Sequence, residues 1–534
     1  MGQPSSEASN AVLYLTYGAF LVMGTGIAWR FRDQDAAHFL SSNGTQTALP
    51  LAFNFVASAL GSGILFSYPE LATITGVQGV VTYALSCALP MLLFGYLGPI
   101  IRRKCPEGFV LTEWTRQRYG TVAMLYLSFM TLFTLFLYMV SELSALGQVV
   151  NLLTGLDGLP AMIVQCVVTT IYTSLGGFRI SFITDIVQGV MVIGLIIIAT
   201  ITIGAKTDID RHLIDESGYL KPTLLGWQLL YILPVAIFTN DFFLSSFWLR
   251  TFASKTDKDL RIGVSVAAIA IACVLTLVGS TGMIAYWAGA WPGNPPQAGS
   301  VAFFSLLHSL PTWVIGIVLV MTVTMSTAAF DSLQSAMISS ASNDFFRNRL
   351  NIWFIRGAVV LIIIPVIVLA LKAPSILQIW LISDLVSAST IPVLIFGLYD
   401  GFYWWRGFEV VVGGLGGILS IFIFGVIYYG NAQEAGELLL VQQGLYTGDW
   451  GVFGAFVAAP VGSMLWGFGA LALRLSVQWI MARSRGERFT GLDRPLPTVA
   501  MAGAGIPQQR SDSEAEFETT EGLDGSTGKA GKFF

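Results

Sequence analysis

Apolar stretches of about 20 residues recur along almost the whole chain, and each is long enough to cross a bilayer. Hydrophobic residues make up 54% of the 534 residues and charged residues 11%, against about 25% charged in soluble domains. Backbone groups in lipid must be satisfied within the segment, which favours helices. The sequence therefore predicts an all-α polytopic membrane protein with about thirteen transmembrane helices. The predicted spans are residues 12–29, 49–72, 78–100, 122–153, 159–175, 182–205, 225–248, 262–290, 312–341, 353–373, 375–398, 408–430 and 452–475.

The connecting loops carry Lys and Arg unevenly, and this bias sets the orientation of a membrane protein. One set of loops holds sixteen basic residues, with Arg250 counted after the seventh span, and the alternate set holds four. The N-terminus is therefore predicted outside and the C-terminus in the cytoplasm. Residues 1–480 form the predicted membrane domain, and the polar composition of 481–534 predicts a disordered cytoplasmic tail. Within this tail Ser511 and Ser513 are hypothetical phosphorylation sites, and a solvated tail without that role fits as well.

Two predicted spans have an easily broken backbone. The second span contains Gly61, Gly63 and Pro69, and the seventh contains Pro234 followed by Asn240. Transporters interrupt helices in this way near the middle of the membrane, where freed carbonyl groups and helix ends face an ion or substrate. Glycine and proline also serve packing in membrane helices, so the spacing alone is suggestive. If each broken span opens a five-helix unit, the chain contains two inverted repeats, about 49–205 and 225–398, with extra helices at 12–29, 408–430 and 452–475.

Acidic residues lie at or near membrane depth without a matching set of buried Lys or Arg. They are Glu70, Glu142, Asp185, Asp241, Asp331 and Asp384. Charges inside a bilayer are costly and mark functional sites. Glu142 and Asp331 lie well inside long spans, which favours a polar cavity, whereas Glu70, Asp185 and Asp384 fit an interfacial position equally well. An excess of buried acid, with a dense run of Ser and Thr over 322–344, predicts that the protein handles a metal ion, a proton or a cationic substrate.

Several motifs together resemble the sodium:solute symporter family, and within it the branch of fungal and plant urea-active transporters. The stretches that carry the resemblance include "ALGSGILFSYPELATITGVQG" (59–79), "CPEGFVLTEWTRQRYG" (105–120), "YTSLGGFRISFITDIVQG" (172–189) and "FWLRTFAS" (247–254). The resemblance covers about residues 35–480, with the stretch at 172–189 the most specific. It implies a five-plus-five inverted-repeat core and alternating access driven by a cation gradient.

The resemblance also implies a cation site between the second and ninth spans. Aligning on Pro69 places its backbone-carbonyl ligands at Ala57 and Leu60, with the carbonyl of Val323 and the hydroxyls of Ser326 and Thr327 opposite. A second register, anchored on Asp331 and Asp344, puts Ala328 and Ala329 at the hydroxyl positions. That register weakens Na⁺ coupling and leaves H⁺. Asp185 matches the family's aspartate on the cation exit route.

The substrate is less well specified by the sequence. Urea is our first expectation, and the residues that could form its site are Ser58, Glu142, Asn240, Asp241 and Trp248. Glu142, Asp241 and Asp331 are alternative candidates for proton coupling. A polyamine or choline would use the same carboxylates within an aromatic cage.

A nutrient sensor with the same fold is the alternative from another functional class, and no enzymatic activity is predicted. We expect Na⁺ or H⁺ as the coupling ion, no other cofactor, and no nucleic-acid partner. Residence in the plasma membrane is expected from the family resemblance.

Overall fold

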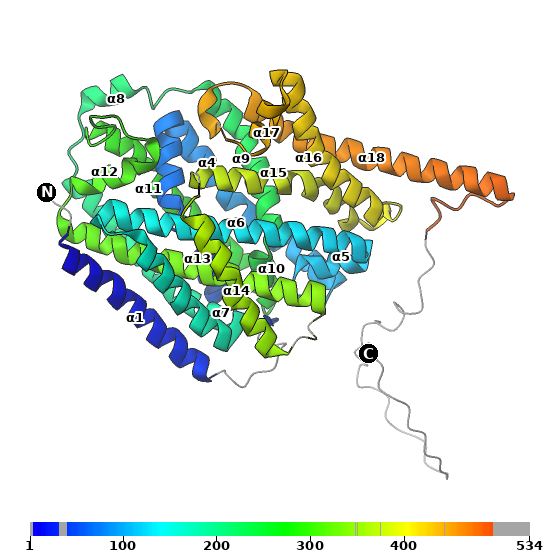
Figure 1. Cartoon of the computed structure of the whole chain (residues 1–534), viewed down its shortest axis with the longest axis horizontal. Helices are drawn as coiled ribbons and strands as arrows, with labels where there is room; N and C mark the ends of the chain where they lie inside the picture. Colours follow the sequence, from blue (N-terminus) through cyan, green and yellow to red (C-terminus); the bar gives the residue numbers. More distant parts are fainter. Residues whose placement is uncertain are drawn as a thin grey trace, which may run out of the picture. The chain divides into compact units, whose positions relative to one another are not determined.

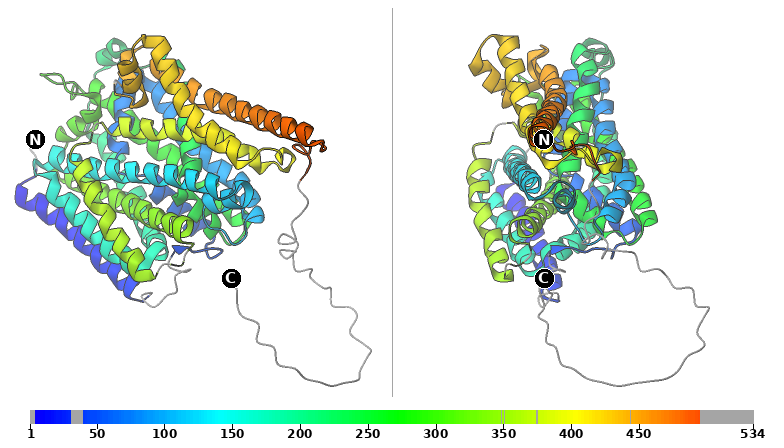
Figure 2. Two further views of the ribbon diagram at one scale, coloured as in Figure 1. Left: turned by 45° about the vertical axis from the view of Figure 1, so that its right-hand side comes forward. Right: turned by 90° about the vertical axis from the view of Figure 1, so that its right-hand side faces the viewer.

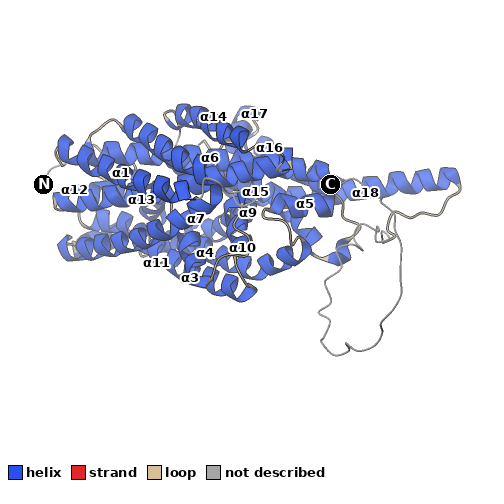
Figure 3. Cartoon of the chain, turned by 90° about the horizontal axis from the view of Figure 1, so that it is seen from below, coloured by secondary structure: helices blue, strands red, loops and turns tan. Residues whose placement is uncertain are grey.

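The computed structural model describes residues 4–30, 40–347, 349, 351–373, 375–442 and 444–494. Within these ranges the secondary structure is helical, with one isolated β-bridge between Gln46 and Ser254 (Figure 3). The longer helices are α1 (Ser6–Arg30), α3 (Ala48–Ala59), α4 (Ile64–Lys104), α6 (Thr121–Thr154), α7 (Gly158–Lys206), α9 (Leu224–Phe243), α11 (Asp257–Trp287), α13 (Thr312–Phe346), α14 (Ile352–Ala370), α15 (Ile376–Ile395), α16 (Gly407–Tyr429) and α18 (Gly451–Arg485). The shorter helices are α5 (Leu111–Tyr119), α8 (Arg211–Ser217), α10 (Ser245–Ala253), α12 (Ala302–His308) and α17 (Ala432–Leu439).

Among the described residues, nine helices are long and apolar enough to cross a membrane, and the bent pair α9–α10 makes a tenth. Two of the nine are interrupted by a glycine with positive φ, at Gly76 in α4 and at Gly177 in α7. Each interruption falls between two predicted spans, so α4 contains parts of two spans and α7 contains two. The predicted number of thirteen and the predicted orientation stay predictions.

Each helix that opens a predicted repeat is broken, the first at the predicted Gly61 and Gly63 and the second at Leu244, beyond the predicted Pro234 and Asn240. The first is split into α3 and α4 at residues 60–63, and the second bends by 62° between α9 and α10. Leu244 lies at this bend in an extended conformation, which ends α9 and lets α10 begin at Ser245. The breaks leave helix ends inside the bundle, where backbone groups lack partners of their own.

Helix α13 lies in the interior of the bundle. In the most apolar 18-residue stretch of α13, 78% is buried inside the protein, compared with 33% in the same kind of stretch of α18. Helix α13 packs against α6 and α7. Helix α11 packs against α4, and α9 packs against both α4 and α15. Helix α1 lies alongside α7 (Figure 1), and α16 and α18 run side by side (Figure 2). The polar residues of α13 therefore face neighbouring helices rather than lipid.

The C-terminal helix α18 continues to Arg485, past residue 481 where the tail was expected to begin. The chain divides into Met1–Gly491 and Leu492–Phe534, and only 492–494 of the second unit are described. Ser511 and Ser513 lie outside the described residues.

Candidate functional site

The break between α3 and α4 is closed by a carboxylate from a third helix. Glu142 of α6 accepts hydrogen bonds from the Ser62 amide at 2.7 Å and from the Ser62 hydroxyl at 2.5 Å. The first amides of a helix have no intrahelical acceptor, and the positive end of its dipole attracts an anion. A methyl group added at Gly61 would overlap Glu142 Oε2, so the glycine lets the carboxylate approach the backbone.

The residues predicted to bind a cation lie on both sides of this break. The carbonyls of Ala57 and Leu60 belong to the last turn of α3, which has no further helical turn to pair with. On α13, which packs against α3, the Thr327 hydroxyl donates to the Val323 carbonyl at 2.6 Å. Ser326 is also within this region, because its hydroxyl lies near the Glu142 carboxylate.

Ser326 also receives a hydrogen bond that sequence reasoning did not predict. The Gln165 side chain on α7 donates to the Ser326 hydroxyl at 2.7 Å and accepts from the Tyr17 hydroxyl at 2.9 Å. The pattern of Ser and Thr in α13 gives no indication of these partners. Among the described residues, no group of three or more His, Cys, Asp or Glu side chains could hold a metal ion.

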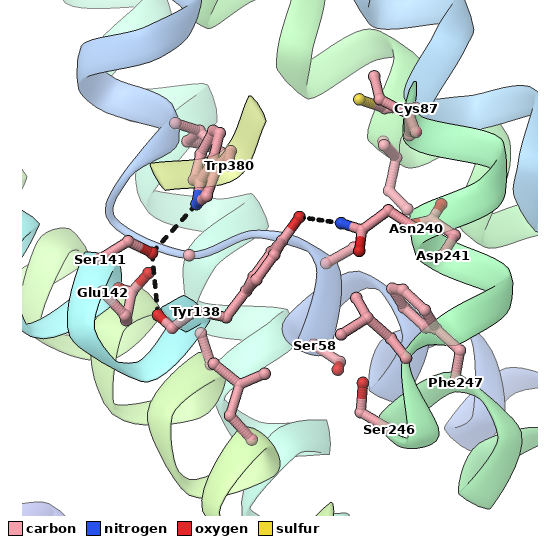
Figure 4. A pocket seen from close by; sticks show the side chains of 18 of the residues that line it. Ser58, Cys87, Tyr138, Ser141, Glu142, Asn240, Asp241, Ser246, Phe247 and Trp380 are labelled. Carbon is pink, nitrogen blue, oxygen red and sulfur yellow. Dashed lines mark hydrogen bonds between the residues drawn. The ribbon is translucent and has the colours of Figure 1, made fainter. Parts of the chain in front are cut away.

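A cavity lies beside the break, and its polar lining is acidic. It brings together Ser58, Glu142, Asn240 and Asp241, which the sequence predicts at the substrate site, and adds Asp384 from α15. None of the described residues that line it is Lys, Arg or His. Figure 4 shows Glu142 and Asp241 on opposite sides of this cavity. A site of this kind favours a ligand with more than one positive charge.

Asp384 is the residue of the cavity that most clearly lacks a partner. Its side chain is buried, and its Oδ1 atom makes no hydrogen bond with any described residue. The carboxylate lies close enough to Asp241 for the two to repel each other electrostatically. A buried, unsatisfied carboxylate is costly, and an incoming cation would relieve that cost.

Aromatic rings form part of the apolar lining of the cavity. Tyr138 stacks on Trp380 with ring centroids 6.2 Å apart, and Tyr68 stacks on Tyr83 at 3.8 Å. Trp380 donates to the Ser141 hydroxyl at 3.1 Å, which fixes the ring, and the Asn240 amide donates to the Tyr138 hydroxyl (Figure 4). Ring faces attract ammonium groups, so this lining suits the same class of ligand.

Trp248, which the sequence predicts at the substrate site, lies outside the cavity in the hydrophobic core. It is fully buried, and its indole donates to the Phe242 carbonyl at 2.6 Å. Its ring packs edge-on against Phe94 and Phe242, with centroids 5.2 and 5.0 Å apart. Trp248 does not line the cavity, and Trp380 provides the indole there instead.

One buried arginine changes the expected charge pattern. The sequence reading counted Arg250 among the loop cations, but the bend at Leu244 turns α10 inward and leaves the Arg250 side chain fully buried. Its guanidinium donates to Asp185 at 2.5 Å and to the Ser332 hydroxyl at 2.8 Å. The expectation that no basic group matches the buried acids is therefore wrong at Asp185, and Arg250 does not belong with the loop cations.

Asp331 lies beside this pair and does not line the cavity, so the prediction that it faces a polar cavity is wrong. Its carboxylate accepts hydrogen bonds from the hydroxyls of Tyr172 at 2.5 Å and of Ser181 at 2.8 Å. The Ser332 hydroxyl lies within 3.4 Å of carboxylate oxygens of both Asp331 and Asp185 and so joins them. We call Asp185, Arg250, Asp331 and Ser332, with Tyr172, Ser181 and Thr184, the arginine cluster.

The sequence was compared with known families, proteins and structures. Residues 39–406 match the pattern of the sodium:solute symporter family. The chain is 52% identical over 499 residues to the spermidine transporter DUR31 of Candida albicans, covering 93% of this chain and 95% of the relative. It is 25% identical over 201 residues to the urea-proton symporter DUR3 of Oryza sativa subsp. japonica, covering 36% of this chain and 28% of that protein.

Among solved structures, a Na⁺-coupled sialic acid symporter in a substrate-bound outward-open state aligns with a TM-score of 0.67 at 16% identity. The alignment covers 86% of this chain and 98% of that one. At this identity the likeness shows the fold, which confirms the predicted symporter-like helical architecture. With the family pattern covering most of the membrane part, the chain belongs to the sodium:solute symporter family.

Proposed function

We propose that this protein, a cation-coupled solute symporter, takes up a polyamine, with spermidine as the first candidate. The observation that carries the proposal is a cavity with three carboxylates, Glu142, Asp241 and Asp384, and no basic side chain among the described residues that line it. The similarity over nearly the full length to a protein described as a spermidine transporter supports the same ligand class.

The lining of the cavity suits a linear chain of alternating charge and hydrocarbon. Glu142 lies on one side and Asp241 on the other, so ammonium groups at the two ends of one molecule would each meet an acid (Figure 4). Asp384 adds a third acid to the lining. Between these ends the lining is apolar and aromatic, including Ile237 and Leu275, which would contact methylene groups. A hydrogen bond between charged partners contributes about 1.5–3 kcal/mol, so losing one acid is expected to weaken binding roughly 10- to 150-fold.

Urea is the second candidate, and it was our first expectation from the sequence. Asn240, Ser58 and Ser246 offer neutral hydrogen-bonding groups in the same cavity, and a rice urea-proton symporter is among the relatives. Urea carries no charge, however, and would leave the unpaired Asp384 carboxylate without a counter-ion. We therefore place the polyamine first.

The test is uptake of radiolabelled spermidine by the purified full-length protein in liposomes, with urea uptake measured in parallel. Asp241→Asn and Asp384→Asn should each raise the KM for spermidine at least tenfold, because each removes one charge-assisted bond. Asp208→Asn, which neutralises an exposed loop aspartate, is the matched control and should leave the KM unchanged.

Saturable urea uptake that excess spermidine does not inhibit would overturn the polyamine assignment in favour of urea. Binding of spermidine without any uptake would instead favour the sensor. We also propose that the protein resides in the plasma membrane, which a fluorescent fusion imaged in cells tests directly.

A further inference from the structure

The arginine cluster contains more negative than positive groups. Asp185 and Asp331 are two carboxyl groups with one guanidinium between them, and all three side chains are fully buried. With both acids ionised the cluster carries one uncompensated negative charge inside the membrane domain. An uncompensated buried charge is expensive, so the cluster is expected to hold one further cation.

The hydrogen bonds assign the guanidinium to Asp185 and leave Asp331 to hydroxyl groups. Arg250 donates to Asp185 at 2.5 Å, whereas the groups that donate to Asp331 at 2.5 and 2.8 Å are the hydroxyls of Tyr172 and Ser181. Asp331 is therefore the acid without a charged hydrogen-bond partner of its own.

A buried amide next to the cluster indicates a place for a bound water molecule. Gln188 lies one helical turn from Thr184 on the same face of α7, and Thr184 in turn donates to Asp331 at 3.4 Å. The Gln188 side chain is fully buried near the Tyr172 hydroxyl, and neither of its amide atoms makes a well-formed hydrogen bond with a described residue. Orphaned buried polar groups of this kind are commonly satisfied by ordered water, and a water there would connect the cluster to a source of protons.

We propose that Asp331 is the proton-carrying residue of this symporter, so that H⁺ is the ion transported with the substrate. The proton binds to a carboxylate oxygen of Asp331 from water on one side of the membrane and leaves to water on the other side. No other bond is made or broken. The inference concerns the coupling ion and rests on the proposed transport function.

Geometry favours a proton over Na⁺ at this place. Each oxygen of Asp331 accepts a short hydrogen bond from a hydroxyl, at 2.5 and 2.8 Å. On protonation one of these hydroxyls can turn and accept from the carboxylic acid, whereas a metal ion would have to break these hydrogen bonds. A second cation would also be repelled by Arg250, whereas a proton neutralises Asp331 on the atom itself. The titratable or charged groups facing Asp331 are Tyr172 and Asp185 from α7 and Arg250 from α10. Glu142 on α6 accepts from Ser62 instead, and Tyr17 on α1 donates to Gln165.

The cluster is connected to the substrate cavity through two helix segments. Arg250 donates to the carbonyls of Ser246 at 2.9 Å and of Asn54 at 3.1 Å. Ser246 lines the cavity, and Asn54 lies one turn before Ser58, which also lines it. Protonation of Asp331 changes the charge facing Arg250, and Arg250 in turn holds α3 and α10. This contact gives a route by which proton binding and substrate binding influence each other.

The experiment compares proton-driven uptake with exchange in liposomes that contain the purified full-length protein. At zero membrane potential and one proton per substrate, one pH unit should sustain about tenfold accumulation of spermidine in the wild type. Asp331→Asn should abolish this accumulation while spermidine exchange continues and no longer depends on pH. Asp331→Glu should recover pH-driven accumulation. Asp344→Asn is the matched control, since Asp344 is a buried aspartate of the same helix bonded to Thr112, and it should behave as wild type.

A second readout does not depend on the substrate. In infrared difference spectra of the protein between high and low pH, Asp331→Asn should remove one carboxylic-acid band that Asp344→Asn retains. Retention of that band, or of tenfold accumulation, in Asp331→Asn would overturn the proton assignment. Wild-type uptake driven by a Na⁺ gradient alone would overturn it as well. Absence of wild-type spermidine exchange would instead refute the proposed substrate, and the infrared band would still decide the role of Asp331.

Discussion

Replacing Arg250 by methionine is the most informative perturbation of the fold, because one guanidinium holds four helices. It donates to Asn54 of α3, to Ser246 of its own helix α10, to Asp185 of α7 and to Ser332 of α13. Methionine fills most of the volume without a charge. It leaves the Asp185 carboxylate buried without its ionic partner.

The expected changes in the free energy of unfolding depend on which buried groups each variant leaves without a partner. Breaking a fully buried ion pair from one side costs about 3–5 kcal/mol, so Arg250→Met should lower the free energy of unfolding by that amount. Asp185→Asn should cost less, about 1–3 kcal/mol, because Arg250 keeps three uncharged acceptors and still faces Asp331. The double variant removes the unpaired charge of Asp185. Its loss of unfolding free energy should be smaller than the sum of the losses in the two single variants, with a coupling of about 1–3 kcal/mol.

The assay is a double-mutant cycle on the purified protein, with unfolding followed by circular dichroism during titration with sodium dodecyl sulfate in mixed micelles. Lys255→Met is the matched control, since Lys255 lies just beyond α10 with its side chain exposed. The reasoning is refuted if Arg250→Met lies within about 1 kcal/mol of wild type, a cost typical of an exposed ion pair. It is also refuted if the double variant is as destabilised as the simple sum.

Three further outcomes are expected. Gly76→Ala should greatly reduce the yield of folded protein, measured by size exclusion of a fluorescent fusion, because Gly76 has a φ of 61° and its added methyl would meet the backbone of the loop before α9. Gly18→Ala, in open space on α1, should leave the yield unchanged. Trp380→Leu should raise the KM for substrate, whereas Trp248→Phe should leave the KM unchanged and lower thermal stability. The opposite pattern would contradict the placement of the two rings. Burial, with a smaller contribution from a nearby glutamate, raises the pKa of the Cys105 thiol to about 11, so maleimide should not label it at neutral pH in the folded protein but should label it after denaturation.

Much of the architecture follows from local features of the sequence. The length and apolarity of the spans require helices in lipid, and the glycines at residues 61 and 63 mark where the first helix breaks. The second break was predicted near Pro234 and Asn240 and lies further along, at Leu244. Glu142 was predicted to face a polar cavity because it lies in the middle of a long span, and it does line one. These predictions succeed because each depends on one segment and its solvent.

The partners of the polar residues were decided only by the tertiary structure. The sequence predicts Arg250 in a loop, because the predicted span ends at residue 248. In the structure the bend at Leu244 turns the helix of Arg250 toward Asp185. The same packing places Trp248 among other rings and brings Trp380, far along the chain, into the cavity. Composition and spacing determine that a helix crosses the membrane and that its acids need a cation. The identity of that cation, whether an arginine, a proton or a substrate amine, depends on which distant helices meet, and a single sequence carries no local signal for it.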